Sequence, residues 1–120
     1  MKKIVSAAAL TVAALALSTS ALAADVAAGE AIYKKNCAGC HGNTGAGNGP
    51  AASSLKPKPA NFVAADYKDS TGKNPSEYSD AELSAIVENG RKGTAMPAWK
   101  KSLNAAQTAD VVAYIRSLHK

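Results

Sequence analysis

The stretch CAGCH, residues 37–41, places two cysteines three positions apart and a histidine directly after the second. These are both cysteines of the 120-residue chain. Residues at i and i+3 of a helical turn lie on one face, so the two sulfur atoms point the same way. They can then add to the two vinyl groups along one edge of a haem, while the imidazole of His41 reaches the iron. This spacing is that of c-type haem attachment.

Three other uses of the cysteine pair fit the sequence less well. A thioredoxin-like pair needs a βαβ setting and a helix N-terminus that lowers one thiol pKa, whereas this pair follows a helical segment. A zinc site needs further ligands, and besides His41 the chain offers only His119. A disulfide closing so short a loop would constrain the unfolded chain little. We therefore expect one haem c, attached covalently through Cys37 and Cys40.

The first 23 residues are typical of an export signal. Lys2 and Lys3 precede a run of Ala, Leu and Val, and Ala21-Leu22-Ala23 has the small residues of a cleavage site. The alternative is an uncleaved membrane anchor, since the stretch is long enough to span a bilayer. Its high alanine content and its Ser and Thr interruptions favour cleavage. We expect a signal peptide at 1–23 and one domain at 24–120, exported to the periplasm as a soluble protein without a stable membrane anchor.

The composition of the domain favours a cofactor and argues against nucleic acid. A chain this short buries a limited fraction of its surface, and aromatic residues make up only 5% of it. A cofactor would supply part of the missing core. Loss of the two leader lysines lowers the net charge of +5 to about +3. The remaining basic residues come as scattered pairs rather than a stripe, at Lys34-Lys35, Arg91-Lys92 and Lys100-Lys101.

Three segments have helical patterns, and no segment of useful length alternates like a strand, which predicts an all-α fold. The helices are expected to begin at the caps Asp25, Ser79 and Asn104. The first should run towards Cys37, the second should stop at Asn89-Gly90, and the third should continue almost to the C-terminus. The residues expected to face inward are Val26, Gly29 and Tyr33 in the first, Leu83, Ile86 and Val87 in the second, and Val111, Tyr114, Ile115 and Leu118 in the third.

A long loop separates the first two expected helices. Residues 42–62 contain four glycines and three prolines. A loop of this length inside so small a domain is expected where it wraps a ligand or packs as an Ω-loop. The loop therefore agrees with an enclosed cofactor.

Met96 and His119 are the candidates for a second axial ligand of the iron. A lone methionine is usually core filler, but Met96 lies in the turn-rich GTAMPAW, residues 93–99, where Pro97 fixes the chain. His119 is next to the end of a terminal helix, where fraying is expected. We therefore expect His41 and Met96 as metal ligands. Such a pair gives a higher potential than two histidines, and it leaves the iron no vacant position, which favours electron transfer over catalysis.

With these motifs the chain resembles the class I cytochromes c, specifically the small bacterial periplasmic monohaem ones. The resemblance rests on CAGCH, on PKPANF at 57–62, on GTAMPAW and on ADVVAYIRSL at 109–118, and it covers essentially all of residues 24–120. It implies helices packed around one haem, with the first and last helices crossing. Gly29 would then let Val111 and Tyr114 approach closely.

The resemblance also implies roles for residues around the haem. In the family a proline carbonyl accepts the N–H of the axial histidine, and Pro50 fits that position. Thr94 resembles a residue that hydrogen-bonds near the methionine sulfur or a propionate. Trp99 would close the methionine side of the haem or donate to a propionate, with ordinary core packing as the alternative. Asn61 and Phe62 are expected to line the lower haem rim.

The expected function is that of an electron carrier, not an enzyme. One electron would pass at a time between redox partner proteins docked at the haem edge near the cysteines. Lysines around this edge would attract an acidic patch on a partner, or they are simply solvated charges. Two alternatives remain: a haem protein that binds small ligands or peroxide after Met96 leaves the iron, and a thiol–disulfide protein.

Overall fold

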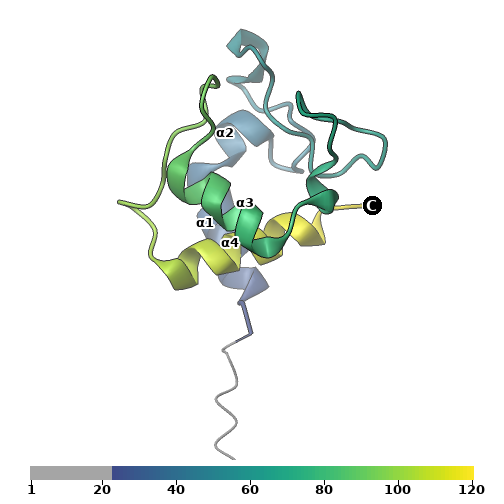
Figure 1. The fold of residues 1–120 in the computed structure, drawn as a ribbon. Coiled ribbons are helices and arrows are strands. Elements are labelled where there is room, and N and C mark those ends of the chain that lie inside the picture. Colours follow the sequence, from purple (N-terminus) through teal and green to yellow (C-terminus); the bar gives the residue numbers. More distant parts are fainter. Residues whose placement is uncertain (1–22) are drawn as a thin grey trace, which may run out of the picture.

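The computed structural model describes residues 23–120, and every regular element in that part is helical. Figure 1 shows α1 and α4 crossing, α3 beside α4, and long loops on the side of α2. The all-α prediction is confirmed. The four α-helices and two 3₁₀ turns are α1 Val26–Asn36, α2 Ala38–His41, η1 Ala52–Ser54, η2 Pro75–Glu77, α3 Asp80–Asn89 and α4 Ala105–Ser117.

The expected export signal lies outside the described residues except for Ala23. Its cleavage therefore stays a prediction from the sequence. From residue 23 onward, none of the helices has the length and apolar character needed to cross a bilayer.

Side-chain caps fix the helix starts where the sequence predicts them. The Asp25 carboxylate accepts the N–H of Ala28 at 3.1 Å and so caps α1. Ser79 and Asn104 each form a complete capping box, which satisfies amide groups that the first turns of α3 and α4 leave unpaired. The short helix α2, which follows α1 after the single residue Cys37, has no cap or periodic signal of its own in the sequence.

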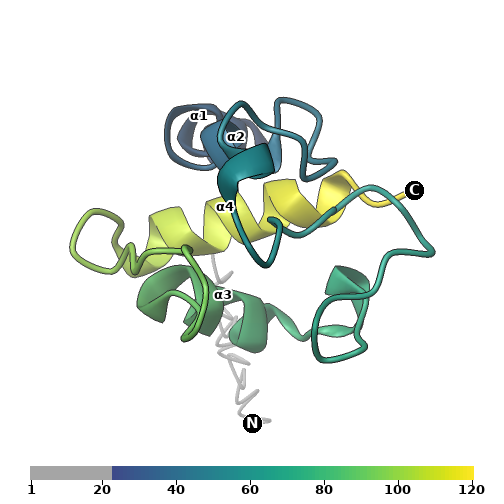
Figure 2. The same ribbon diagram turned by 90° about the horizontal axis from the view of Figure 1, so that it is seen from above.

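The crossing of α1 over α4 depends on a glycine and a tyrosine (Figure 2). A Cβ atom at Gly29 would overlap the carbonyl of Asp110 and lie 3.0 Å from the amide nitrogen of Val111. Tyr33 is fully buried, its hydroxyl donates to the carbonyl of Gly42 at 2.7 Å, and its ring centroid lies 5.1 Å from that of Tyr114. The close approach predicted for Gly29 is therefore present.

The inward faces follow the predicted spacing with three exceptions. Val26 is 44% exposed, because it is the first residue of α1 and precedes the crossing. Ile86 and Leu118 are only partly buried. The remaining predicted positions belong to the buried core, which also includes Phe62, Leu103 and Val112.

The segment between the glycine-rich loop and α3 is organised by one buried asparagine. Asn74 is 3% exposed, and its amide nitrogen donates to the carbonyls of Ala64 at 3.0 Å, Ala65 at 3.3 Å and Tyr67 at 2.9 Å. Its amide oxygen accepts the N–H of Ser76 at 3.0 Å and so begins η2. Because one side chain bonds to four backbone groups of this segment, it holds residues 64–76 as a wall of the site described next.

Candidate functional site

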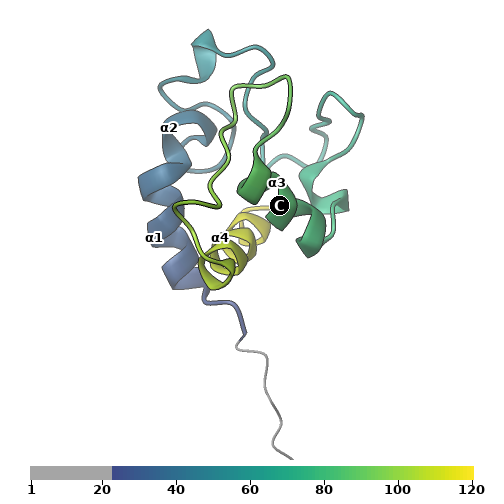
Figure 3. The ribbon, with the colours of Figure 1, turned by 60° about the vertical axis from the view of Figure 1, so that its left-hand side comes forward.

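A cavity of about 200 Å³ lies among α2, α3 and the loops that face them. In Figure 3, α2 and α3 stand on different sides of the molecule, and the chain that follows α3 arches above them. The lining comes from the CAGCH turn, the inner face of α3 and parts of residues 55–62, 67–78 and 91–99. Segments far apart in the sequence therefore converge on one mostly apolar space.

The two cysteines and the histidine line this cavity together. The amide nitrogens of Cys40 and His41 donate to the carbonyl of Cys37 at 3.2 and 2.9 Å, so the motif is wound into a tight helical turn. Cys37 and Cys40 are not joined in a disulfide, and both are partly buried. Burial, with a smaller effect of Cys40, raises the pKa of the Cys37 thiol to about 11. A reactive redox thiol needs a lowered pKa, so this environment argues against a thioredoxin-like pair.

The imidazole of His41 is oriented by a backbone carbonyl, but it is not that of Pro50. Nδ1 lies 3.1 Å from the carbonyl oxygen of Ala60. A carbonyl only accepts, so Nδ1 carries the proton and Nε2 keeps a free lone pair. The Pro50 prediction is wrong because the loop folds back on itself and brings residue 60 to the ring, while Pro50 is exposed. Burial lowers the pKa of His41, and the bond to Ala60 opposes this only in part.

Phe62 supports the same imidazole, whereas Asn61 has another role. The Phe62 ring stacks on His41 with centroids 4.5 Å apart and planes inclined by 25°, and it lines the cavity as predicted. Asn61 is absent from the lining. Its side-chain oxygen accepts the N–H groups of Val63 at 2.9 Å and Ala64 at 3.1 Å. The side-chain oxygen of Asn61 thus shapes the turn that follows it, and the rim role expected from the resemblance stays a prediction.

Met96 lies in a tightly closed loop that also lines the cavity. Gly90, with φ of 71°, ends α3 and begins this loop. The Thr94 hydroxyl donates to the carbonyl of Arg91 at 2.6 Å and accepts the N–H of Met96 at 3.2 Å. Thr94 thus bonds to the backbone of the loop, and its expected role near the methionine sulfur or a propionate stays a prediction. Trp99 lines the cavity too, and its amide donates to the carbonyl of Val87 at 3.0 Å.

His119 is separated from the cavity that contains the cysteines. It is exposed near the chain end and lines a second hollow with Arg116 and Phe62 instead. In addition, no group of three or more His, Cys, Asp or Glu side chains between residues 23 and 120 is arranged to hold a metal ion. Of the two candidate second ligands, only Met96 shares a cavity with His41.

A polar cluster of Asp69, Tyr78 and Arg91, which no sequence motif indicates, also lines the cavity. The Tyr78 hydroxyl donates to Asp69 Oδ2 at 2.5 Å, and Arg91 Nη2 lies 3.2 Å from the same oxygen and 2.7 Å from the hydroxyl. The Asp69 side chain is only 5% exposed. Its pKa is held well below the usual range, because hydrogen bonds from Thr71, Tyr78 and the backbone outweigh the upward effect of burial.

This lowered pKa predicts how Asp69→Asn changes the pH dependence of stability. The ionised carboxylate stabilises the folded chain above the unfolded-state pKa of about 4, and the benefit declines as the pH falls below it. The stability difference between wild type and Asp69→Asn should be constant near neutral pH and shrink below about pH 4. Urea denaturation over a pH series measures this difference. A difference that grew towards acid pH would contradict the assigned environment.

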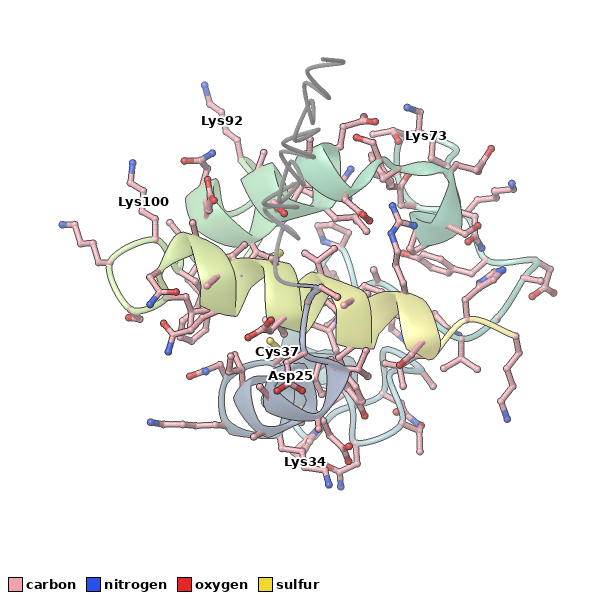
Figure 4. The ribbon with its side chains drawn as sticks, turned by 90° about the horizontal axis from the view of Figure 1, so that it is seen from below. Asp25, Lys34, Cys37, Lys73, Lys92 and Lys100 are labelled. Carbon is pink, nitrogen blue, oxygen red and sulfur yellow. The ribbon has the colours of Figure 1, made fainter. Side chains whose placement is uncertain are left out.

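The exposed lysines do not gather into a single patch. Figure 4 shows Lys34, Lys73, Lys92 and Lys100 pointing outward on different sides of the domain. Lys34 pairs with Glu30 at 2.8 Å, while Lys58 reaches the cavity lining. Positive charge is therefore distributed around the domain.

The residues of the cavity fit a covalently bound haem. Two thiols lie on one turn, an imidazole has a free nitrogen, a thioether faces the same space, and the walls are largely apolar. A soft thioether and an imidazole are ligands that haem iron accepts.

Comparisons with known proteins agree with this chemistry. The sequence model of the family described as Cytochrome c matches residues 26–119. Cytochrome c6 of a Picosynechococcus species is 38% identical over 117 residues, which cover 96% of this chain and 92% of that protein. The cbb3-type cytochrome c oxidase subunit CcoP of an Azospirillum species is 36% identical over 111 residues. That match covers 85% of this chain but only 32% of the subunit.

A solved structure has a similar fold. A chain of the reducing HAO-like protein complex of Kuenenia stuttgartiensis superposes with a TM-score of 0.66 and 33% identity. The superposition covers 79% of this chain and 43% of that one. The chain therefore spans nearly all of a small relative and less than half of two larger ones.

Proposed function

The chain belongs to the cytochrome c family and carries covalently bound haem c, and from this premise we propose that it is a soluble periplasmic one-electron carrier. Cys37 and Cys40 would form the two thioether links, and His41 and Met96 would be the ligands of the iron. Electron transfer follows from the family; the ligand pair and the compartment are our proposals. The leader-like sequence of residues 1–23 supports the periplasmic location.

One observation carries the ligand assignment: His41 and Met96 line one cavity, with His41 Nε2 left free. The Ala60 carbonyl orients the imidazole and increases its basicity as a ligand. The closed loop around Thr94 fixes the position of Met96. The haem supplies one-electron chemistry at its iron. The protein contributes the orientation of both ligands and a largely dry, apolar surrounding.

An iron ligated on both sides has no free position for a substrate. The cavity that contains these ligands is also lined by Phe62, which stacks on the histidine, and by Trp99. Such a site favours transfer of an electron through the haem edge over binding of oxygen or peroxide. Donor and acceptor proteins would dock where the CAGCH turn reaches the surface, with Gly39 exposed there. The scattered lysines would steer acidic partners in a salt-dependent manner.

Carbon monoxide distinguishes the carrier from a ligand-binding haem protein. We expect the visible spectrum of the reduced native protein to remain unchanged under carbon monoxide, because Met96 occupies the second axial position. The measurement is a difference spectrum at neutral pH, with the Met96→Ala variant as a positive control that should bind the gas. Ready binding by the native protein would favour the alternative function of ligand binding or peroxidase activity.

A further inference from the structure

The loop that carries Met96 is closed on itself at its base. We define the methionine loop as residues 90–97. The Arg91 amide donates to the carbonyl of Met96 at 3.4 Å, and Thr94 bonds to the backbone of both residues. The backbone of Arg91 and the position of Met96 are therefore coupled: a shift of one moves the other.

The side chain of the same arginine connects this loop to a different wall of the cavity. Its two hydrogen bonds within residues 23–120 both run from Nη2, one to Asp69 Oδ2 and one to the Tyr78 hydroxyl. The Arg91 guanidinium also lies 5.6 Å from the centre of the Tyr78 ring. The methionine loop is thus tied to residues 22 and 13 positions earlier in the chain.

The anchor on the far wall is itself rigid. Asp69 Oδ1 accepts the amide N–H of Thr71 at 2.8 Å, that of Lys73 at 3.1 Å and the Thr71 hydroxyl at 2.6 Å. Tyr78 immediately precedes the Ser79 cap of α3, and it holds Asp69 through its hydroxyl. Arg91 therefore binds a preorganised acceptor, so little side-chain entropy is lost beyond that of its own ordering.

We propose that Asp69, Tyr78 and Arg91 form a clamp that positions the methionine loop and limits its opening. The clamp controls how readily an external ligand replaces Met96 on the iron. Asp69, Tyr78 and Arg91 are positioning residues, because each acts through Met96 and none is assigned to the iron. This inference rests on the proposed ligation by Met96.

Burial separates the clamp from the ordinary ion pairs of this surface. The side chains of Asp69 and Arg91 are 5% and 28% exposed, whereas those of Lys68 and Glu77, paired at 3.3 Å in the same region, are 55% and 50% exposed. Because solvent screens the charges, such an exposed pair contributes almost nothing to stability. Removal of one clamp partner instead leaves a poorly solvated charge without its counter-charge, which favours opening of the loop.

Imidazole binding to the ferric holoprotein tests the clamp. Imidazole competes with Met96 for the iron, so its apparent affinity increases with the fraction of open loops. We expect Asp69→Asn and Arg91→Gln to raise this affinity about tenfold or more, and Tyr78→Phe to raise it less. Arg91→Lys should restore part of the wild-type value, since it keeps the charge but loses the planar fork. The imidazole affinity of the matched control, Lys68→Gln, should stay within about twofold of the wild-type value. Optical titration measures all five variants.

A double-mutant cycle with Met96→Ala separates a positioning role from a general loss of stability. If the clamp acts through Met96, Asp69→Asn has no further effect on imidazole affinity once Met96 is absent. Tyr78→Phe keeps the hydrogen bonds that Asp69 Oδ1 accepts from Thr71 and Lys73. It therefore tests the clamp even if Asp69→Asn gives little folded protein. Wild-type affinity in both Tyr78→Phe and Arg91→Gln would overturn the clamp and leave Met96 ligation standing. Unchanged affinity in Met96→Ala itself would instead overturn the proposed ligation, and the clamp with it.

Discussion

Replacing Met96 by alanine is expected to abolish the methionine-to-iron(III) charge-transfer band and to lower the midpoint potential markedly. The thioether is a soft ligand that favours ferrous iron, so its loss favours the oxidised state. We expect a decrease well beyond about 59 mV, which corresponds to a tenfold change in the equilibrium constant of a one-electron couple. Visible spectroscopy of the ferric protein and a redox titration measure the two effects.

His119→Ala is the matched control for this substitution. His119 is the other candidate ligand from the sequence, but it lies outside the cavity that contains His41. We expect the variant to keep both the charge-transfer band and the wild-type potential. An unchanged potential in Met96→Ala, together with a shifted one in His119→Ala, would contradict the assignment and identify His119 as the ligand.

Gly29→Ala is expected to destabilise the domain by about 3 kcal/mol or more, since overpacking of a closed interface costs about 1–3 kcal/mol and occasionally exceeds it. The new methyl group would overlap the carbonyl of Asp110 on α4, which is backbone and cannot rotate away. Helix propensity alone predicts the opposite sign, because alanine is better than glycine in a helix by roughly 1 kcal/mol. The sign of the change in unfolding free energy therefore shows whether steric overlap at the helix crossing or helix propensity dominates.

Chemical denaturation of the holoprotein measures this effect, and Gly39→Ala provides the comparison. A Cβ atom at Gly39 meets no heavy atom within 4 Å, and this glycine is exposed in α2. We expect its substitution to leave the free energy of unfolding unchanged or to raise it by up to about 1 kcal/mol, the difference in helix propensity. A neutral or stabilising Gly29→Ala would show that α1 and α4 do not approach as closely as described.

The sequence predicts the helices well because their signals are local. Each cap precedes its first turn within a few residues, and the inward spacing of α3 and α4 needs no knowledge of their partners. The CAGCH motif is equally local, so residue types and spacing alone centre the site on Cys37, Cys40 and His41. Gly29 can be predicted to lie at the crossing, because glycine destabilises a helix relative to alanine unless close packing requires the missing side chain.

The sequence predicts the surroundings of the site less well, because they depend on where the long loops fold back against the rest of the chain. The acceptor for His41 is Ala60, a backbone carbonyl that carries no side-chain signal and lies 19 residues away. For Asn61 the resemblance indicates only a place at the haem rim, and the turn that its amide oxygen closes with Val63 has no signal in the sequence. Asp69 lies in a polar loop, and nothing near it in the sequence indicates that Arg91 will reach it. Long-range pairing of this kind requires the folded chain.

The mass of the exported protein after acid extraction tests whether haem is attached covalently through Cys37 and Cys40, on which every other assignment depends. Haem c held by two thioether bonds survives this treatment, because its attachment does not depend on the folded state. We expect one pigmented species with the mass of the processed chain plus one haem, in which Cys37 and Cys40 resist alkylation. A colourless chain of peptide mass, with both thiols open to an alkylating reagent, would contradict it.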